Sequence, residues 1–267
     1  MERKSISIDS KIISYYTAGD GKALVLLHGF GADSTIWEEQ ISYLSKNYQV
    51  IAPDLPGISN SGLISDVSME GLASMVKTII EEEEIENIVL IGHSMGGYAT
   101  LAFAEKYPEL LQAFGLFHST ATADNEEKIA GRRKGIEFTR KHGAKAFLES
   151  TAPKMFGAAT KQEQPQLYES FIKNLPEMSN ESVINYYEAM MQRPDRTEVL
   201  KNTKVPVLFI YGEQDEIIDV HKTIGQASLP STASVHILKK SGHLGMIEEP
   251  QESNKILEAF LSDLNIY

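Results

Sequence analysis

Short apolar runs, rich in Val, Ile and Leu, recur along the chain in alternation with helical patterns and are typical of β-strands. Eight of these runs lie at residues 5–8, 12–16, 23–28, 48–53, 87–92, 113–118, 205–211 and 234–238. The first two predict an antiparallel pair. The next four are apolar almost throughout, as strands buried on both faces of a parallel sheet are.

Helical spacing of apolar residues fills the intervals between these strands. It predicts helices at residues 34–45, 67–83, 94–107 and 251–264, the third of which ends before Pro108. The glutamates at 81–84 are expected to form a solvated helix end.

From residue 119 to 202 the helical spacing continues without a strongly β-branched run. This pattern predicts a helical cap at 119–202, inserted into a core made of 1–118 and 203–267. The predicted fold class is α/β, with a mostly parallel eight-stranded sheet flanked by helices.

Composition narrows the classes of partner. The chain has 267 residues, of which 42% are hydrophobic, so it can bury a sizeable core. Its 25 Lys and Arg against 37 Asp and Glu give a net charge of −12, which repels nucleic acid and anionic membranes. No run of signal-peptide length opens the sequence, and none approaches the ~18 apolar residues of a membrane helix. We therefore expect a cytoplasmic protein with no nucleic-acid or membrane partner.

The segment Gly92-His93-Ser94-Met95-Gly96 follows an apolar strand and opens a helical pattern. A nucleophile on a sharp strand-to-helix turn needs neighbours without side chains, and the two glycines meet this need. The alternative is a tight glycine turn without chemistry, which the flanking strand and helix disfavour. We predict that Ser94 is the nucleophile of a serine hydrolase.

A serine nucleophile needs a histidine base, which in turn needs an acid to orient it. Reactive groups in such a sheet gather beyond the carboxyl ends of the strands, in the order Ser, acid, His. Asp215 follows the strand at 205–211, and His243 follows the strand at 234–238. These two residues are our predicted acid and base. The competing acids Glu213, Glu216 and Asp219 are of a kind that is usually solvated or caps helices.

The other histidines are weaker candidates for the base. His28 precedes a glycine turn and is expected to make a structural hydrogen bond. His93, within the strand-to-helix turn itself, and His236, within a strand, cannot readily reach Ser94. His118 ends a strand at the predicted opening of the site, and with Gly29 it is a candidate for the substrate pocket.

The glycine-rich turn after the strand at 23–28 predicts an oxyanion hole formed by the backbone N–H groups of Phe30 and Met95. The Phe30 side chain is expected to pack in the pocket. Gly29 and Gly31 also permit a dinucleotide-site interpretation, but Ser34 stands where the third glycine belongs. No two histidines have helical ligand spacing, and cysteine is absent, which excludes disulfides and thiolate metal sites. We expect no cofactor and no metal.

Five ordered motifs give the chain a resemblance to the α/β-hydrolase family along nearly its whole length. They are His28-Gly29-Phe30-Gly31, Pro53-Asp54-Leu55-Pro56-Gly57, Gly92-His93-Ser94-Met95-Gly96-Gly97, Gly212-Glu213-Gln214-Asp215, and Ser241-Gly242-His243 with Glu248-Glu249-Pro250. Residues 193–197 are similar to those of 3-oxoadipate enol-lactonases and small carboxylesterases. Residues 57–61 depart from the family pattern, because they lack the histidine of its His-Gly-x-Ser segment.

The expected function is hydrolysis of a small-molecule carboxylic ester or lactone through a Ser-His-Asp triad and an acyl-enzyme. Alternatives on the same fold are a C–C bond hydrolase or lyase, a cofactor-free haloperoxidase or perhydrolase, and a small-molecule receptor. Trp37 and most of the large cap side chains are expected to pack in the core. The sequence leaves open the substrate, the residues with which the cap lines the pocket, and whether the protein is a monomer or homodimer.

Overall fold

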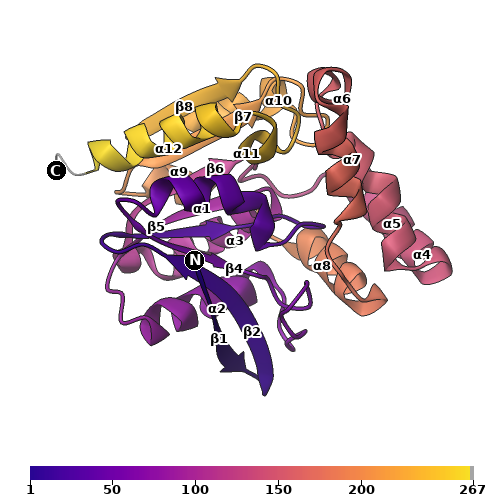
Figure 1. Cartoon of the computed structure of the whole chain (residues 1–267), viewed down its shortest axis with the longest axis horizontal. Helices are drawn as coiled ribbons and strands as arrows, with labels where there is room; N and C mark the ends of the chain where they lie inside the picture. Colours follow the sequence, from indigo (N-terminus) through magenta and orange to yellow (C-terminus); the bar gives the residue numbers. More distant parts are fainter. Residues whose placement is uncertain (265–267) are drawn as a thin grey trace.

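The computed structural model describes residues 1–264, and the last three positions of the predicted core, 265–267, lie outside them. Eight strands form one sheet in the order β1-β2-β4-β3-β5-β6-β7-β8 (Figure 1). They are β1 Glu2–Ile8, β2 Lys11–Ala18, β3 Ala23–Leu27, β4 Gln49–Pro53, β5 Ile88–His93, β6 Leu111–Phe117, β7 Val207–Gly212 and β8 Ala233–Leu238. β2 pairs antiparallel with β1 and β4, and the pairs from β4 to β8 are parallel. The predicted eight-stranded, mostly parallel sheet is confirmed.

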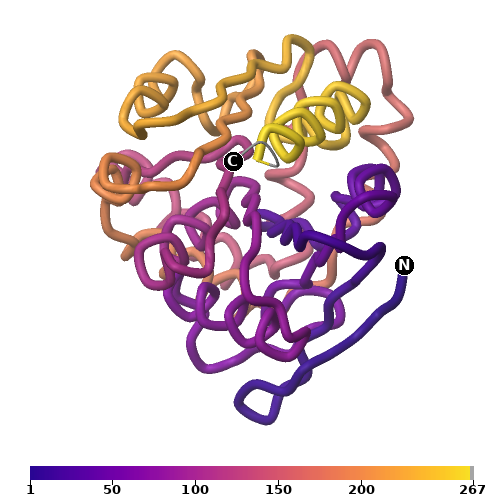
Figure 2. Tube along the Cα trace, turned by 90° about the vertical axis from the view of Figure 1, so that its left-hand side faces the viewer, coloured from indigo at the N-terminus to yellow at the C-terminus, as the bar shows by residue number. Residues whose placement is uncertain are grey.

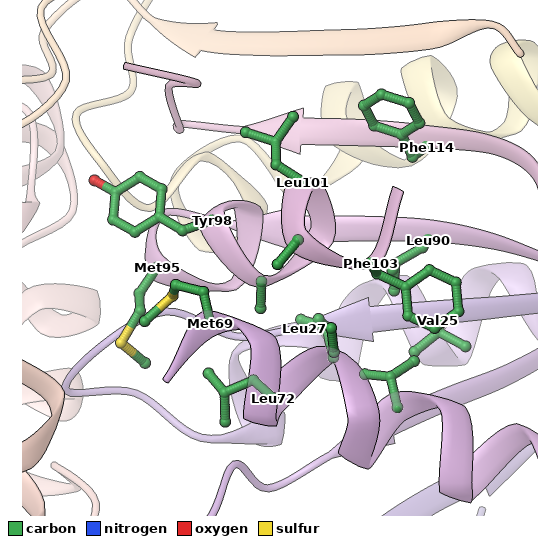
Figure 3. Packing of buried hydrophobic residues seen from close by; sticks show 14 of the residues in the cluster. Val25, Leu27, Met69, Leu72, Leu90, Met95, Tyr98, Leu101, Phe103 and Phe114 are labelled. Atoms are coloured by element: carbon green, nitrogen blue, oxygen red, sulfur yellow. The ribbon is translucent and has the colours of Figure 1, made fainter. Parts of the chain in front are cut away.

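Two apolar layers cover the sheet, because successive side chains of a strand point to opposite faces. Val25 and Leu27 of β3 pack with helices α2 (Met69–Glu82) and α3 (Met95–Lys106). Leu24 and Leu26 pack on the other face with α1 (Glu38–Leu44) and α12 (Pro250–Asp263). Figure 3 shows the first layer around Leu27 and its neighbours on α2 and α3.

Six α-helices lie between β6 and β7; α4 to α8 stand at one side of the sheet, whereas α9 lies back at the core against α3 (Figure 1). They are α4 Glu126–His142, α5 Ala144–Thr151, α6 Ala158–Glu163, α7 Pro165–Lys173, α8 Asn180–Gln192 and α9 Thr197–Asn202. The hydroxyl of Tyr186, on α8, donates a hydrogen bond of 2.7 Å to the Pro56 carbonyl of the core. A bridge between Ile58 and Met178 makes a second connection. These contacts hold the helical segment over the carboxyl ends of the strands.

The edges of the sheet lie far from each other: the β1–β2 hairpin and β8 are at opposite ends of the molecule in both views (Figures 1 and 2). Within residues 1–264, no helix is long and apolar enough to cross a bilayer.

Two local predictions need correction. The predicted helix at 34–45 is a 3₁₀ turn (Ser34–Trp37) followed by α1, because Asp33 caps the turn by accepting the Thr35 N–H. The predicted solvated glutamates at 81–84 include Glu83, whose side chain is only 7% exposed. Glu83 accepts hydrogen bonds from Lys4 and Tyr15 and thereby joins α2 to the edge hairpin.

Candidate active site

Ser94 occupies a strained turn between β5 and α3. Its backbone has φ 51° and ψ −114°, a conformation that a residue other than glycine adopts only when its surroundings force it. A Cβ on Gly92 would lie 2.2 Å from the Gly96 carbonyl oxygen, and a Cβ on Gly96 would lie 2.6 Å from that of Leu27. The two glycines of the motif are therefore sterically required, and the turn presents Ser94 at the end of the strand.

The loops after β7 and β8 bring Asp215 and His243 together. Nδ1 of His243 lies 2.7 Å from Oδ2 of Asp215, in a hydrogen bond buried from solvent. The other carboxylate oxygen accepts the N–H groups of Ile217 and Ile218 at 2.8 and 2.9 Å. Burial acts to raise the pKa of Asp215, but attraction to His243 and these hydrogen bonds outweigh it and lower the pKa. Asp215 is therefore an ionised carboxylate aimed at the histidine.

Two of the competing acids have other roles, and the third, Glu216, is exposed. Glu213 pairs with Lys239 at the surface, at 3.4 Å. Asp219 caps the short helix α10 (Val220–Thr223) by accepting the His221 N–H.

The backbone of His243 is fixed from two sides. Its N–H donates to the Met155 carbonyl at 2.7 Å, and its carbonyl oxygen lies 2.8 Å from Nε2 of His93. Since a carbonyl only accepts, His93 carries its proton on Nε2. His93, which the sequence ruled out as a base, thus positions the residue predicted to be the base.

Glu248 organises the loop around His243. Its Oε1 accepts the N–H groups of Gly242 and Leu244, on either side of the histidine. Its Oε2 accepts from the Gly157 N–H and the Thr160 hydroxyl of the helical segment. Burial raises the pKa of Glu248, against the effect of these hydrogen bonds. One carboxylate therefore ties the histidine loop to the helices above it.

The loop predicted to form the oxyanion hole, at residues 28–31, lies against the turn that holds Ser94. A Cβ on Gly29 would come within 3.0 Å of the Ser94 Cβ, so only glycine permits this approach. Gly29 therefore packs against the nucleophile turn, and its predicted place in the substrate pocket stays a prediction. No hydrogen-bond partner for the N–H groups of Phe30 and Met95 is found within residues 1–264, which leaves both as free donors beside Ser94. His28 makes the expected structural contacts, since its ring joins Gly29 O and the Leu55 N–H.

Ser94 and His243 border the same cavity, of about 110 Å³. No hydrogen bond joins their side chains in the described part of the chain, and such a contact commonly tightens only when substrate binds. Phe30 also borders this cavity, as expected, and its ring lies 4.9 Å from that of Tyr187 on α8. Four larger hollows in the described part of the chain, of about 580, 840, 490 and 380 Å³, contain none of the predicted catalytic residues.

His118 does not line the pocket, and this prediction is corrected. Its backbone is left-handed, with φ 49°, and its side chain is fully buried. Nε2 accepts the Gly245 N–H at 3.0 Å, so the single proton of the neutral ring lies on Nδ1, 3.5 Å from Asp215 Oδ2. Burial lowers the pKa of His118 to about 3, despite attraction to Asp215. His118 lies behind Asp215 and does not border the cavity of Ser94 and His243.

Burial also lowers the pKa of His28 and of His93, which keeps both rings neutral. Although the rings of His93, His118 and His243 lie close together, no group of His, Asp or Glu side chains in residues 1–264 is arranged to hold a metal ion.

The large aromatic side chains mostly pack as the sequence predicts. Trp37 is fully buried against Phe117, at 5.5 Å between ring centroids. Tyr168 and Phe171 pack on Phe156. Tyr187 and Met190, by contrast, border the cavity beside Ser94.

Sequence reasoning missed Arg132, a cationic side chain of α4 that borders the cavity. It pairs with the buried Asp124, which also pairs with Arg193. α4 carries charged residues over most of its length, so Arg132 could not be distinguished from its solvated neighbours. Asp124 just before the helix gave no distinct signal either, because Glu126 and Glu127 follow it closely.

The family model for the alpha/beta hydrolase fold matches residues 22–250. The chain belongs to this family and is a hydrolase. It is 27% identical to a thermophilic esterase from Thermogutta terrifontis, solved with malate bound, with a TM-score of 0.92 and 99% of each chain covered. It is 22% identical to the enol-lactonase from Burkholderia xenovorans LB400, with a TM-score of 0.88 over 97% of this chain and 100% of that one. The monoacylglycerol lipase abhd6-A of Xenopus laevis is 25% identical over 98% of this chain and 85% of its own length.

Proposed function

We propose that the protein hydrolyses a small carboxylic ester or lactone through a triad of Ser94, His243 and Asp215. The observation that carries the proposal is the buried 2.7 Å contact between Asp215 and His243, beside a cavity that Ser94 also borders. The likeness to the Thermogutta terrifontis esterase supports ester chemistry. It covers nearly the whole of both chains, so the similarity is not confined to the sheet.

In the first half-reaction, His243 takes the proton of Ser94 while the serine oxygen attacks the ester carbonyl. Negative charge then develops on the carbonyl oxygen, and the free N–H groups of Phe30 and Met95 stabilise it by about 3 kcal/mol per donor. His243 passes its proton to the departing alkoxide, which leaves an acyl group on Ser94. A water molecule, deprotonated by His243, attacks this acyl group, releases the acid and restores the enzyme.

Asp215 keeps the Nδ1 proton of His243 in place, so that Nε2 is free to accept the serine proton. The lowered pKa of Asp215 means that the carboxylate is charged when the histidine becomes a cation. The cation is thereby stabilised at the step that needs it.

In this proposal, residues 119–202 are the cap of the site. Met155 and Gly157 contact the histidine loop, and Tyr187 borders the cavity. The cap therefore sets the size of substrate, and a cavity of about 110 Å³, below the ~300–1,000 Å³ of common ligand sites, favours a short acyl chain.

The test compares Ser94→Ala with Ser228→Ala, a change at an exposed serine. Both variants are incubated with a fluorophosphonate probe and assayed on 4-nitrophenyl acetate and butyrate. We expect Ser94→Ala to lose labelling and turnover while keeping its unfolding temperature, and Ser228→Ala to match the wild type. Wild-type turnover by Ser94→Ala would refute the nucleophile assignment. Failure of the wild type to release a burst of nitrophenol would favour a receptor instead.

A further inference from the structure

Arg132 brings a positive charge to the candidate active site. It lies on α4 and borders the cavity that Ser94 and His243 border. Its side chain is 17% exposed, and its guanidinium carbon stands 5.3 Å from the centre of the Tyr187 ring. Of the residues around this cavity, Arg132 alone carries a permanent charge, and none is an Asp or Glu.

The charges behind Arg132 do not cancel. Nε of Arg132 lies 2.5 Å from Oδ2 of Asp124, while Nη2 of Arg193 lies 2.9 Å from Oδ1 of the same carboxylate. Burial acts to raise the pKa of Asp124, but the two arginines outweigh it and lower the pKa. Two cations thus share one anion, and the buried cluster has a net charge of +1.

The two arginines differ in how their remaining donors are used. Arg193 donates to the carbonyl oxygens of Met190 and Thr122, and its guanidinium lies 3.8 Å from the centre of the Tyr98 ring. Arg132 bonds within residues 1–264 through Nε alone. Its two Nη groups are left as donors at the cavity, where a charged group is costly without a partner.

We propose that Arg132 binds a carboxylate of the substrate, so that the enzyme acts on a small ester or lactone carrying a carboxylate a few bonds from the scissile carbonyl. A carboxylate matches the two free N–H donors of the guanidinium in a bidentate pair and neutralises the excess charge. This inference rests on the proposed hydrolase chemistry at Ser94. The carboxylate takes no part in that chemistry: the ester C–O bond breaks, water supplies the hydroxyl and the proton, and the anion stays bound to Arg132.

The dimensions of the site agree with a compact anionic substrate. The cavity of about 110 Å³ is small for a ligand site, which favours a compact substrate. The overall charge of −12 repels anions at long range, so any preference for an anion arises locally, at Arg132.

Turnover is measured on methyl hydrogen succinate and on methyl succinamate, which has the same shape with an amide in place of the carboxylate. The readout is the ratio of kcat/KM for the anionic ester to that for the neutral ester. We expect this ratio to exceed ten in the wild type and to fall at least tenfold in Arg132→Met, with partial recovery in Arg132→Lys. Arg133→Met, an exposed neighbour on the same helix, is the matched control and keeps the wild-type ratio.

The Arg132→Met variant is expected to fold, because Asp124 keeps Arg193 as a partner. A wild-type ratio of one or less, or a ratio unchanged in Arg132→Met, would overturn the anion site while leaving ester hydrolysis intact.

Binding of free succinate to Ser94→Ala, measured by calorimetry, tests the anion site without turnover. We expect the dissociation constant to rise at least tenfold when Arg132→Met is added. If neither ester is hydrolysed but this weakening is seen, the proposed function fails and the anion site stands. If succinate does not bind, or binds equally without Arg132, the anion site is refuted.

Discussion

Nδ1 of His118 lies 3.5 Å from Oδ2 of Asp215, the same oxygen that accepts the hydrogen bond of His243 at 2.7 Å. The predicted triad acid is thus held between two histidines, one facing the cavity and one buried behind it. Because the Gly245 N–H occupies Nε2 of His118, the ring presents its N–H edge to the carboxylate. His118 is therefore a positioning residue for Asp215, and the contact acts by electrostatic attraction and packing.

Replacing His118 with Asn tests this role, since Asn tolerates the positive φ of the position. The shorter side chain leaves space behind Asp215 and weakens the hold on the Gly245 N–H. We expect kcat on a short ester to fall about tenfold with KM little changed, and the free energy of unfolding to fall by about 1–3 kcal/mol. His236→Asn, on β8 away from the site, is the control. An unchanged kcat with reduced stability would make His118 a structural residue only.

Replacing Asp215 with Asn removes the acceptor that selects the His243 tautomer. As in other serine triads, we expect kcat to fall roughly 10⁴-fold. The fold is expected to be preserved, because Asn keeps an acceptor for the Ile217 and Ile218 N–H groups. Steady-state kinetics on 4-nitrophenyl acetate measure the change. Asp219→Asn, a helix cap in the same loop, serves as the comparison and retains activity. Equal losses in the two variants would contradict the assignment of the acid.

Gly→Ala changes at two positions, one in the nucleophile turn and one on α4, are expected to have opposite effects on stability. A Cβ on Gly92 meets the Gly96 carbonyl oxygen at 2.2 Å, so Gly92→Ala displaces the turn, lowers stability by about 1–3 kcal/mol and reduces ester turnover. Gly131 is exposed on α4, and a Cβ added there would have no atom within 4 Å, so Gly131→Ala is expected to add about 0.5–1 kcal/mol. Urea denaturation and ester-turnover assays on both variants measure these opposite effects. A Gly92→Ala enzyme with normal stability and turnover would show that the turn is not constrained.

Acidification is predicted to destabilise the protein through its buried histidines. Burial lowers the pKa of His28, His93 and His118, the last to about 3, while the unfolded chain protonates near pH 6.5. Between those limits the unfolded state binds more protons, so the free energy of unfolding decreases as pH falls from 6.5. The contribution is fully present above pH 6.5, and a histidine that is charged in the unfolded state but neutral in the folded state adds a slope of about 1.4 kcal/mol per pH unit.

Urea unfolding at pH 4.5, 5.5 and 6.5 measures this slope. Asp124 and Asp215 contribute mainly below this range, because their pKa values are lowered. Glu248, whose pKa is raised by burial, has the opposite effect and reduces the net slope. The His118→Asn variant is expected to give a shallower dependence than the wild type. A free energy of unfolding that stays constant across these three pH values would contradict the assignment of neutral buried histidines.

Much of the candidate site could be predicted because its chemistry follows the strands. Ser94 comes directly after a strand, Asp215 and His243 lie in the loops that follow two other strands, and parallel strands end at one edge of a sheet. The central strands β3 to β7 were equally visible, since a strand buried on both faces is a continuous apolar run. The glycines around Ser94 made the turn predictable, because the turn leaves no space for a side chain at these positions.

The sequence by itself therefore determined the sheet, the nucleophile turn and the order of the predicted triad, all of which depend on short-range patterns. Only the tertiary structure decided that His118 faces Asp215 instead of the cavity, because its left-handed backbone sets the direction of the ring. It also brought Arg132, 38 positions after Ser94, to the same cavity. Packing between distant segments decides in which direction a charged helix such as α4 points a given side chain. Local periodicity therefore cannot predict that direction.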